Sequence, residues 1–254
     1  MPSKTSFCNG TEFRKCLSRW WPLWVIYGVI LFILLPGVLL NARSTIPYVS
    51  TEQIGYLSNV ILSETQMLLP LTAFCAGLLA AAAMFGYLYT PRGAGLAASL
   101  PIKRGCMFRT HLLAGLAMLL SAEVVVFGLA VLIEAVRFTL VIEPLLIWLG
   151  ILALETVVFY GIAVLCAMFT GHVLALPAFY VVLNGLAAGL CWVFSRMAEE
   201  FLFGFTSAAW LEKLGVWLTP VLLLSEACHV QYDTITDAAG NSMLGDPYFA
   251  GLGY

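Results

Sequence analysis

Two glutamates, Glu123 and Glu155, stand in the middle of long apolar segments of the sequence. A charge at the centre of a bilayer costs about 2.5–3.5 kcal/mol on insertion scales, so an acid there usually faces a helix bundle or a water-filled cavity. Each glutamate could contact a cationic group of a substrate or form part of a translocation path. Each could also be a protonated side chain that hydrogen-bonds a neighbouring helix, and the residues leave both interpretations open.

A second chemical feature is the basic stretch at 90–110, TPRGAGLAASLPIKRGCMFRT, which contains no acid. The pattern predicts a short helix over 99–104, because Ser99 is a suitable N-cap and Pro101 is tolerated in a first turn. Such a helix could insert apolar side chains into a partner's cleft. Alternatively, its cations could hold the loop on anionic lipid, at about 1 kcal/mol each. The candidate contact residues are Leu100, Pro101, Ile102, Lys103, Arg104 and Phe108.

Other reactive residues form weaker patterns. The seven cysteines include no CxxC and give neither a zinc-ligand spacing nor a disulfide framework. His172 and the pair Glu199–Glu200 suggest an intramembrane protease, but no arginine follows the pair at helical spacing. The topology derived below also places them on opposite faces of the bilayer. No GxxxxGK(S/T) phosphate loop occurs, so we expect no ATP hydrolysis and no catalytic, cofactor-binding or metal site in this chain.

The composition of the chain predicts the helices that position these residues. Of 254 residues, 61% are hydrophobic and only 10% are charged, whereas soluble domains carry about 25% charged residues. The net charge of −2 gives no reason to expect nucleic acid as a partner. A folded chain with so few charged residues cannot cover its surface with polar groups, so much of that surface must face lipid. This predicts an all-α integral membrane protein with one transmembrane domain over 1–254. Five segments are long enough to cross a bilayer: 20–40, 67–89, 111–136, 145–169 and 173–194.

The segments outside these spans are polar, basic or short. Residues 1–19 are predicted to form a cytoplasmic amphipathic elbow on the membrane surface. The apolar run behind them is too long for a cleavable signal peptide. Residues 210–227 have a short apolar middle interrupted by Pro220, which is typical of an interfacial or re-entrant segment. Residues 195–254 are therefore expected to be mainly extracellular.

Basic residues orient the bundle. With the N-terminus in the cytoplasm, eight of the twelve Lys and Arg residues lie on the inner side. A bias of this kind in short loops sets membrane topology. The connection at 90–110 is thus predicted to be cytoplasmic, and the protein to be a multi-pass protein of the cell membrane.

The fifth span contains a helix-packing motif. Gly185 and Gly189 form GxxxG, which lets two helix backbones approach closely, and Asn184 beside them could add an interhelical hydrogen bond. The motif could pack within the bundle or against a second copy of the chain.

Three of these features together resemble the permease subunit of an ABC transporter of the ABC type-2 (exporter) class, and more narrowly the Firmicute permeases of antibiotic or multidrug efflux. One is the opening FRKCLSRWWPLW at 13–24, and another is SLPIKR at 99–104 followed by Phe108. The third is Leu218-Thr219-Pro220 after the fifth span, which is similar to that family's broken extracellular element. The resemblance covers most of residues 1–226.

The resemblance implies a function. The stretch 99–108 would be a coupling helix held by a separate ATPase dimer, which binds ATP and Mg and drives alternating access. A second permease copy or a homologue would complete the transporter. The family closes with a sixth span, so the resemblance implies either a chain truncated before that span or a segment 210–227 that crosses after all. A regulatory or scaffolding membrane subunit without its own pathway is the alternative.

Overall fold

The computed structural model describes residues 8–44, 61–62, 68–99, 102–136, 142–201, 209–227, 230–236 and 242–249. Five helices in these ranges are long and apolar enough to cross a membrane: Trp21–Asn41, Leu69–Tyr89, Arg104–Val136, Ile142–Phe169 and Ala175–Phe201. The predicted all-α membrane bundle with five spans is therefore confirmed, and the chain is a multi-pass membrane protein. The third span begins at Arg104 instead of residue 111, because its helix continues through the basic residues beyond the apolar run.

The first two spans are not uniform α-helices. The first consists of α2 (Trp21–Phe32), a π-helical turn (Ile33–Gly37) and α3 (Val38–Ser44). Pro36 lies inside the π-helical turn, where its missing N–H and its ring disturb the regular i→i−4 ladder. The second span consists of α5 (Leu69–Phe85) and a 3-10 turn, η3 (Gly86–Tyr89).

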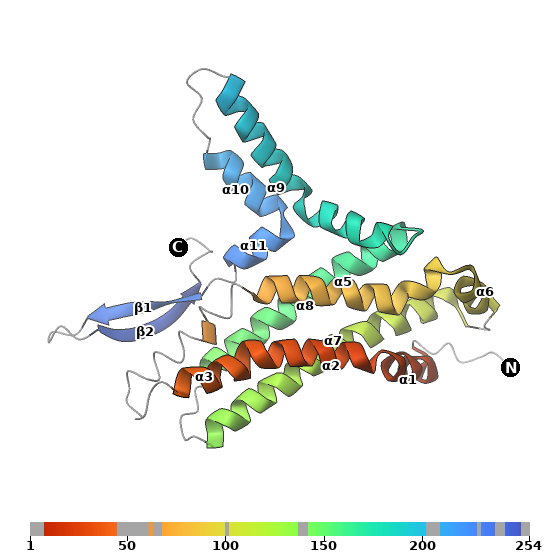
Figure 1. The fold of residues 1–254 in the computed structure, drawn as a ribbon, viewed down its shortest axis with the longest axis horizontal. Helices are drawn as coiled ribbons and strands as arrows, with labels where there is room; N and C mark the ends of the chain where they lie inside the picture. Colours follow the sequence, from red (N-terminus) through yellow and green to blue (C-terminus); the bar gives the residue numbers. More distant parts are fainter. Residues whose placement is uncertain are drawn as a thin grey trace.

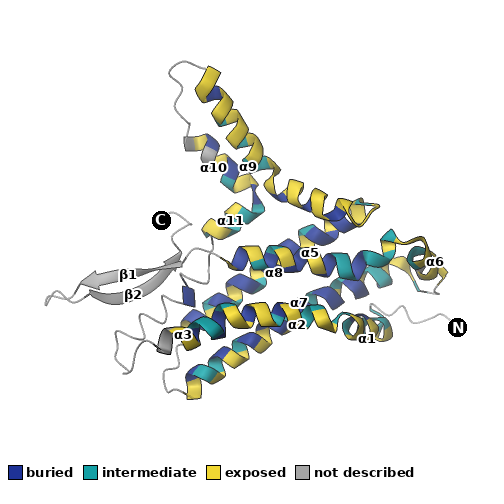
Figure 2. Cartoon of the chain, in the orientation of Figure 1, coloured by how far each residue is buried: buried dark blue, intermediate teal, exposed yellow. Residues whose placement is uncertain are grey.

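The other three spans, α7 (Arg104–Val136), α8 (Ile142–Phe169) and α9 (Ala175–Phe201), are each a single helix. Helix α8 lies at the centre of the bundle, where it packs against α5, α7 and α9, while α2 packs on α7 (Figure 1). Buried positions concentrate on the facing sides of α5, α7 and α8, and α9 is mostly exposed (Figure 2). Exposed residues such as Ile26, Val124 and Leu186 form the apolar outer surface expected against lipid.

Close packing and tyrosine hydroxyls join the central helices. The Tyr160 hydroxyl donates to the carbonyl of Leu112, 3.2 Å away, which ties α8 to α7. The Tyr180 hydroxyl donates to the carbonyl of Phe74 at 3.2 Å, which ties α9 to α5. At the α5–α8 crossing a Cβ on Gly77 would lie 2.9 Å from the backbone nitrogen of Tyr160, so only glycine allows this approach.

Helix α1 (Gly10–Arg19) precedes the first span and packs on α7. Asn9 is its N-cap, with Oδ1 accepting from the backbone N–H of Thr11 at 3.1 Å. Phe13 and Leu17 are partly buried against the core, while Arg14 and Lys15 are exposed. The helix is therefore amphipathic, with its apolar side turned to the bundle.

The connection between the second and third spans differs from the helix predicted over 99–104. The helix of this connection is α6 (Pro91–Ser99). Thr90 is extended and Pro91 begins the helix, because proline disfavours helical geometry in the residue before it and suits a first turn. Ser99 ends α6 instead of starting a helix, and its Oγ donates to the carbonyl of Leu96 at 2.8 Å.

Two short helices follow α9: α10 (Ala209–Leu218) and α11 (Pro220–Ala227). Helix α10 runs back along α9, and Gly215 brings it close, since a Cβ there would lie 3.2 Å from Cβ of Cys191. At the break between α10 and α11, Oγ1 of Thr219 accepts from the N–H of Ala188 at 3.0 Å. Neither helix has the length of a span.

Strands β1 (Val230–Thr236) and β2 (Ser242–Phe249) form an antiparallel hairpin that the sequence analysis did not predict. The pairing matches Val230 with Phe249 and Thr236 with Ser242, with an irregularity between Tyr232 and Thr234.

Candidate functional site

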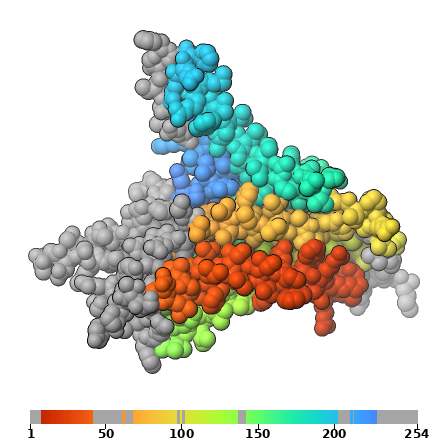
Figure 3. Space-filling view, in the orientation of Figure 1, coloured from red at the N-terminus to blue at the C-terminus, as the bar shows by residue number. Residues whose placement is uncertain are grey.

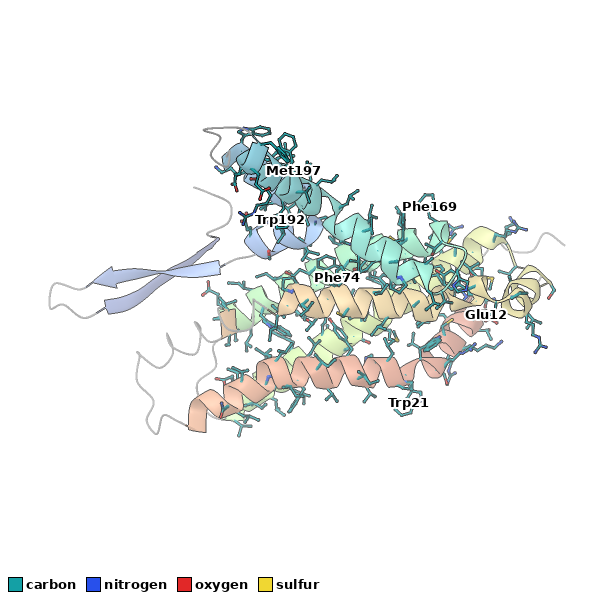
Figure 4. All side chains as sticks on the ribbon, turned by 45° about the horizontal axis from the view of Figure 1, so that its top comes forward. Glu12, Trp21, Phe74, Phe169, Trp192 and Met197 are labelled. Atoms are coloured by element: carbon teal, nitrogen blue, oxygen red, sulfur yellow. The ribbon has the colours of Figure 1, made fainter. Side chains whose placement is uncertain are left out.

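The basic residues gather at one end of the bundle. Helix α1, helix α6 and the start of α7 meet there, and α6 lies across the ends of the spans (Figures 1 and 3). Glu12, the acid of α1, lies at this end (Figure 4). The cations of the described residues here are all exposed: Arg14, Lys15, Arg19, Arg92, Lys103, Arg104 and Arg109. These cations thus share one end of the bundle, called here the basic end.

The predicted partner-contact residues divide into three groups. Lys103 and Arg104 are exposed on the basic end, and Ile102 beside them is half-buried. Phe108 is half-buried and packs against the core, with its ring centroid 5.7 Å from that of Phe85. This inward position follows from the early start of α7, which puts Phe108 on a helical face toward α5. Leu100 and Pro101 lie outside the described residues.

The intramembrane site centres on Glu123, which is fully buried in α7. Its Oε1 accepts from two hydroxyls, Thr156 Oγ1 on α8 at 2.6 Å and the Tyr27 hydroxyl on α2 at 3.0 Å. Its Oε2 has no hydrogen-bond partner among the described residues. The carboxyl group thus joins the first, third and fourth spans through one oxygen, while the other oxygen is buried and can carry a proton.

Glu155 precedes Thr156, the hydroxyl donor to Glu123, on α8. It is also buried, and its Oε2 has no hydrogen-bond partner in the described part of the chain. The two candidates from the sequence are thus both buried, on the packed helices α7 and α8. Sequence reasoning missed Tyr27 and Thr156, although a tyrosine and a threonine within apolar spans are the signal that could have found them.

An apolar cavity of about 250 Å³ adjoins this site between α2 and α5. Tyr27 lines the cavity while its hydroxyl reaches Glu123, so one side chain connects the cavity with the buried carboxyl group. Leu23, Ile30 and Leu79 supply apolar walls. Neither Glu123 nor Glu155 lines the cavity, and Ile30 and Leu79 are also exposed on the outer surface, so the cavity itself suits an apolar molecule.

Nothing in the described part of the chain packs on the two glycines of the GxxxG motif in α9. A Cβ at Gly185 or at Gly189 would have no atom of the described residues within 4 Å. Nδ2 of Asn184 donates to the carbonyl of Tyr180 at 2.9 Å, so its bond lies within α9 instead of between helices. The small-residue face is open.

The residues that suggested a protease are far apart. His172 lies just before α9, and Glu199 and Glu200 lie near its other end. Helix α9 has 27 residues, which at 1.5 Å per residue is about 40 Å. One oxygen of Glu199 pairs with Arg196 at 3.4 Å. The structure does not bring His172 and the glutamates together.

Cys16, on the buried side of α1, contacts His111 of α7. Sγ of Cys16 lies 3.5 Å from Nδ1 of His111, and the His111 ring lies 4.8 Å from that of Tyr87. Burial raises the pKa of the Cys16 thiol, and the negative charge of Glu12 raises it further, while Arg19 opposes the shift. The thiol is therefore held neutral and unreactive. No group of three metal-ligating residues occurs within the described ranges.

Comparisons with protein-family models, curated proteins and solved structures give no significant match for this chain.

Proposed function

We propose that this chain is the membrane-spanning permease subunit of an ABC-type exporter in the bacterial cell membrane. The observation that carries the proposal is the basic end, where α6 lies across the ends of the spans and exposed Lys103 and Arg104 lie at the start of the third span (Figure 1). A helix that follows the second span at Thr90 and precedes the third by four residues can transmit a partner's movement to both. The resemblance of SLPIKR at 99–104 supports the same assignment.

The partner in this proposal is a separate ATPase dimer that binds ATP and Mg and contacts the basic end. A second permease copy or a homologue completes the transporter, and the open small-residue face of α9 at Gly185 and Gly189 is suited to that contact. Substrate moves by alternating access. The apolar cavity beside Tyr27 and the carboxyl groups of Glu123 and Glu155 are the part of the pathway that this chain supplies.

The partner contact is tested by isolating the tagged full chain from native membranes and quantifying the bound ATPase by mass spectrometry. Charge reversal by Lys103→Glu with Arg104→Glu should reduce recovery about tenfold or more, because like charges across an interface cost several kcal/mol. Both side chains are exposed, so the bundle should fold. The matched control is Arg196→Glu, an exposed cation on α9. Absence of any ATPase, or equal recovery with both variants, contradicts the proposal.

A further inference from the structure

A pocket of about 720 Å³ opens at the basic end, separate from the intramembrane carboxyl site. Its walls come from α1, from η3, from α6 and from the first turns of α7. Lys15 and Arg19 supply cationic groups, His111 and Tyr87 supply polar aromatic groups, and Leu96 and Trp20 supply apolar surface. No role described above uses this pocket.

The charge around the pocket favours an anion. Lys15 Nζ pairs with Glu12 Oε1 at 2.9 Å, but the lysine side chain is 67% exposed, and exposed pairs of this kind contribute about 0–1 kcal/mol. Its ammonium can therefore bind a second acceptor. Arg19 makes no salt bridge within the described ranges, and its guanidinium carbon lies 5.7 Å from the centroid of the Trp20 ring. No other acid lines the pocket.

The His111 side chain forms part of the pocket wall. It is 8% exposed, and Sγ of Cys16 lies 3.5 Å from its Nδ1. Its Nε2 is buried and the Met84 backbone lies near the ring, so a ligand in the pocket would pack against the imidazole instead of bonding to Nε2.

We propose that this pocket binds the headgroup of an anionic phospholipid. Its phosphate contacts Lys15 and Arg19, and its acyl chains lie along Leu96 and Trp20. The apolar walls favour a lipid over free phosphate, which would leave them without a contact. Trp20 also immediately precedes the first span, at the depth where phospholipid headgroups lie. Basic pockets beside cytoplasmic helix ends are typical sites for such headgroups.

The test uses the purified full chain in nonionic detergent, with native mass spectrometry to measure binding of dioctanoyl phosphatidylglycerol. Dioctanoyl phosphatidylcholine and inorganic phosphate are the comparison ligands. We expect phosphatidylglycerol to bind at least tenfold more tightly than phosphatidylcholine, and phosphate to leave its binding unchanged. Lys15→Gln with Arg19→Gln should weaken phosphatidylglycerol binding about thirtyfold, because each lost cation contributes about 1 kcal/mol. The control Arg14→Gln removes an exposed cation of α1 that does not line this pocket.

A second variant keeps the test independent of the charge changes. Leu96 is 69% exposed, so Leu96→Ser should fold normally and still weaken phosphatidylglycerol binding. Equal affinities for the two lipids, competition by inorganic phosphate, or unchanged affinity in both variants would each overturn the proposal. The measurement needs no ATPase, so its result is separate from that of the permease proposal.

Discussion

The hydrogen bonds at Glu123 give a prediction whose size can be worked from the structure. Tyr27→Phe and Thr156→Val each remove one of the two donors to Oε1, while the other donor remains at 2.6 or 3.0 Å. Each single change should therefore lower the free energy of unfolding by about 0.5–1 kcal/mol, the range for a membrane hydrogen bond. The double change leaves a buried carboxyl without a donor, which costs about 1–3 kcal/mol beyond the lost bonds.

The double variant should consequently be less stable than the sum of the single variants by about 1 kcal/mol or more. Unfolding is measured in mixed micelles of nonionic detergent with a rising fraction of dodecyl sulfate, followed by helical circular dichroism. The two hydroxyls also lie 3.4 Å from each other, so a small direct coupling remains when the acceptor is removed. Repeating the cycle with Glu123→Leu should therefore reduce the coupling strongly, because the shared acceptor is gone. Additive effects, or a coupling of unchanged size in the Glu123→Leu background, would refute the hydrogen-bond account.

Two further predictions concern the packing at Gly77 and the reactivity of Cys16, the buried cysteine of α1. Gly77→Ala should lower stability in the same assay by about 1–3 kcal/mol, because its Cβ would lie 2.9 Å from the backbone of Tyr160. The control Gly128→Ala should cost almost nothing, because its Cβ would have no atom of the described residues within 4 Å. Equal effects of the two changes would contradict the close crossing. Cys16 should react with maleimide far more slowly than a cysteine placed at exposed Ser18. The reaction rate of Cys16 should also still rise above pH 9, because its raised pKa keeps the thiol protonated at pH values where an ordinary cysteine is ionised. Equal rates at pH 8 would contradict the burial of Cys16.

The spans could be predicted because apolar runs of bilayer length leave few alternatives. The exact helix of the connection between the second and third spans could not be predicted, since Ser99 and Thr90-Pro91 both carry signals for a helix start, and the structure uses the second. The partial burial of Phe108 depends on where α7 begins, so it required the three-dimensional arrangement.

The intramembrane site was predicted in part. Glu123 and Glu155 could be identified because an acid in an apolar run is rare. The hydroxyl donors Tyr27 and Thr156 could not be assigned from sequence, because their role depends on which helices are neighbours. The hairpin was missed although β-branched residues are frequent in VQYDTIT at 230–236, a composition typical of strands.

The orientation of the basic end is tested most directly by labelling α6 in intact cells. Gly95 is exposed, and a Cβ there would have no atom of the described residues within 4 Å, so Gly95→Cys adds an accessible thiol without disturbing the fold. We predict that a membrane-impermeant maleimide labels this variant above the wild-type level only after the membrane is opened. Labelling of the added cysteine from outside intact cells would place α6 on the outer face and contradict the proposed contact with a cytoplasmic ATPase.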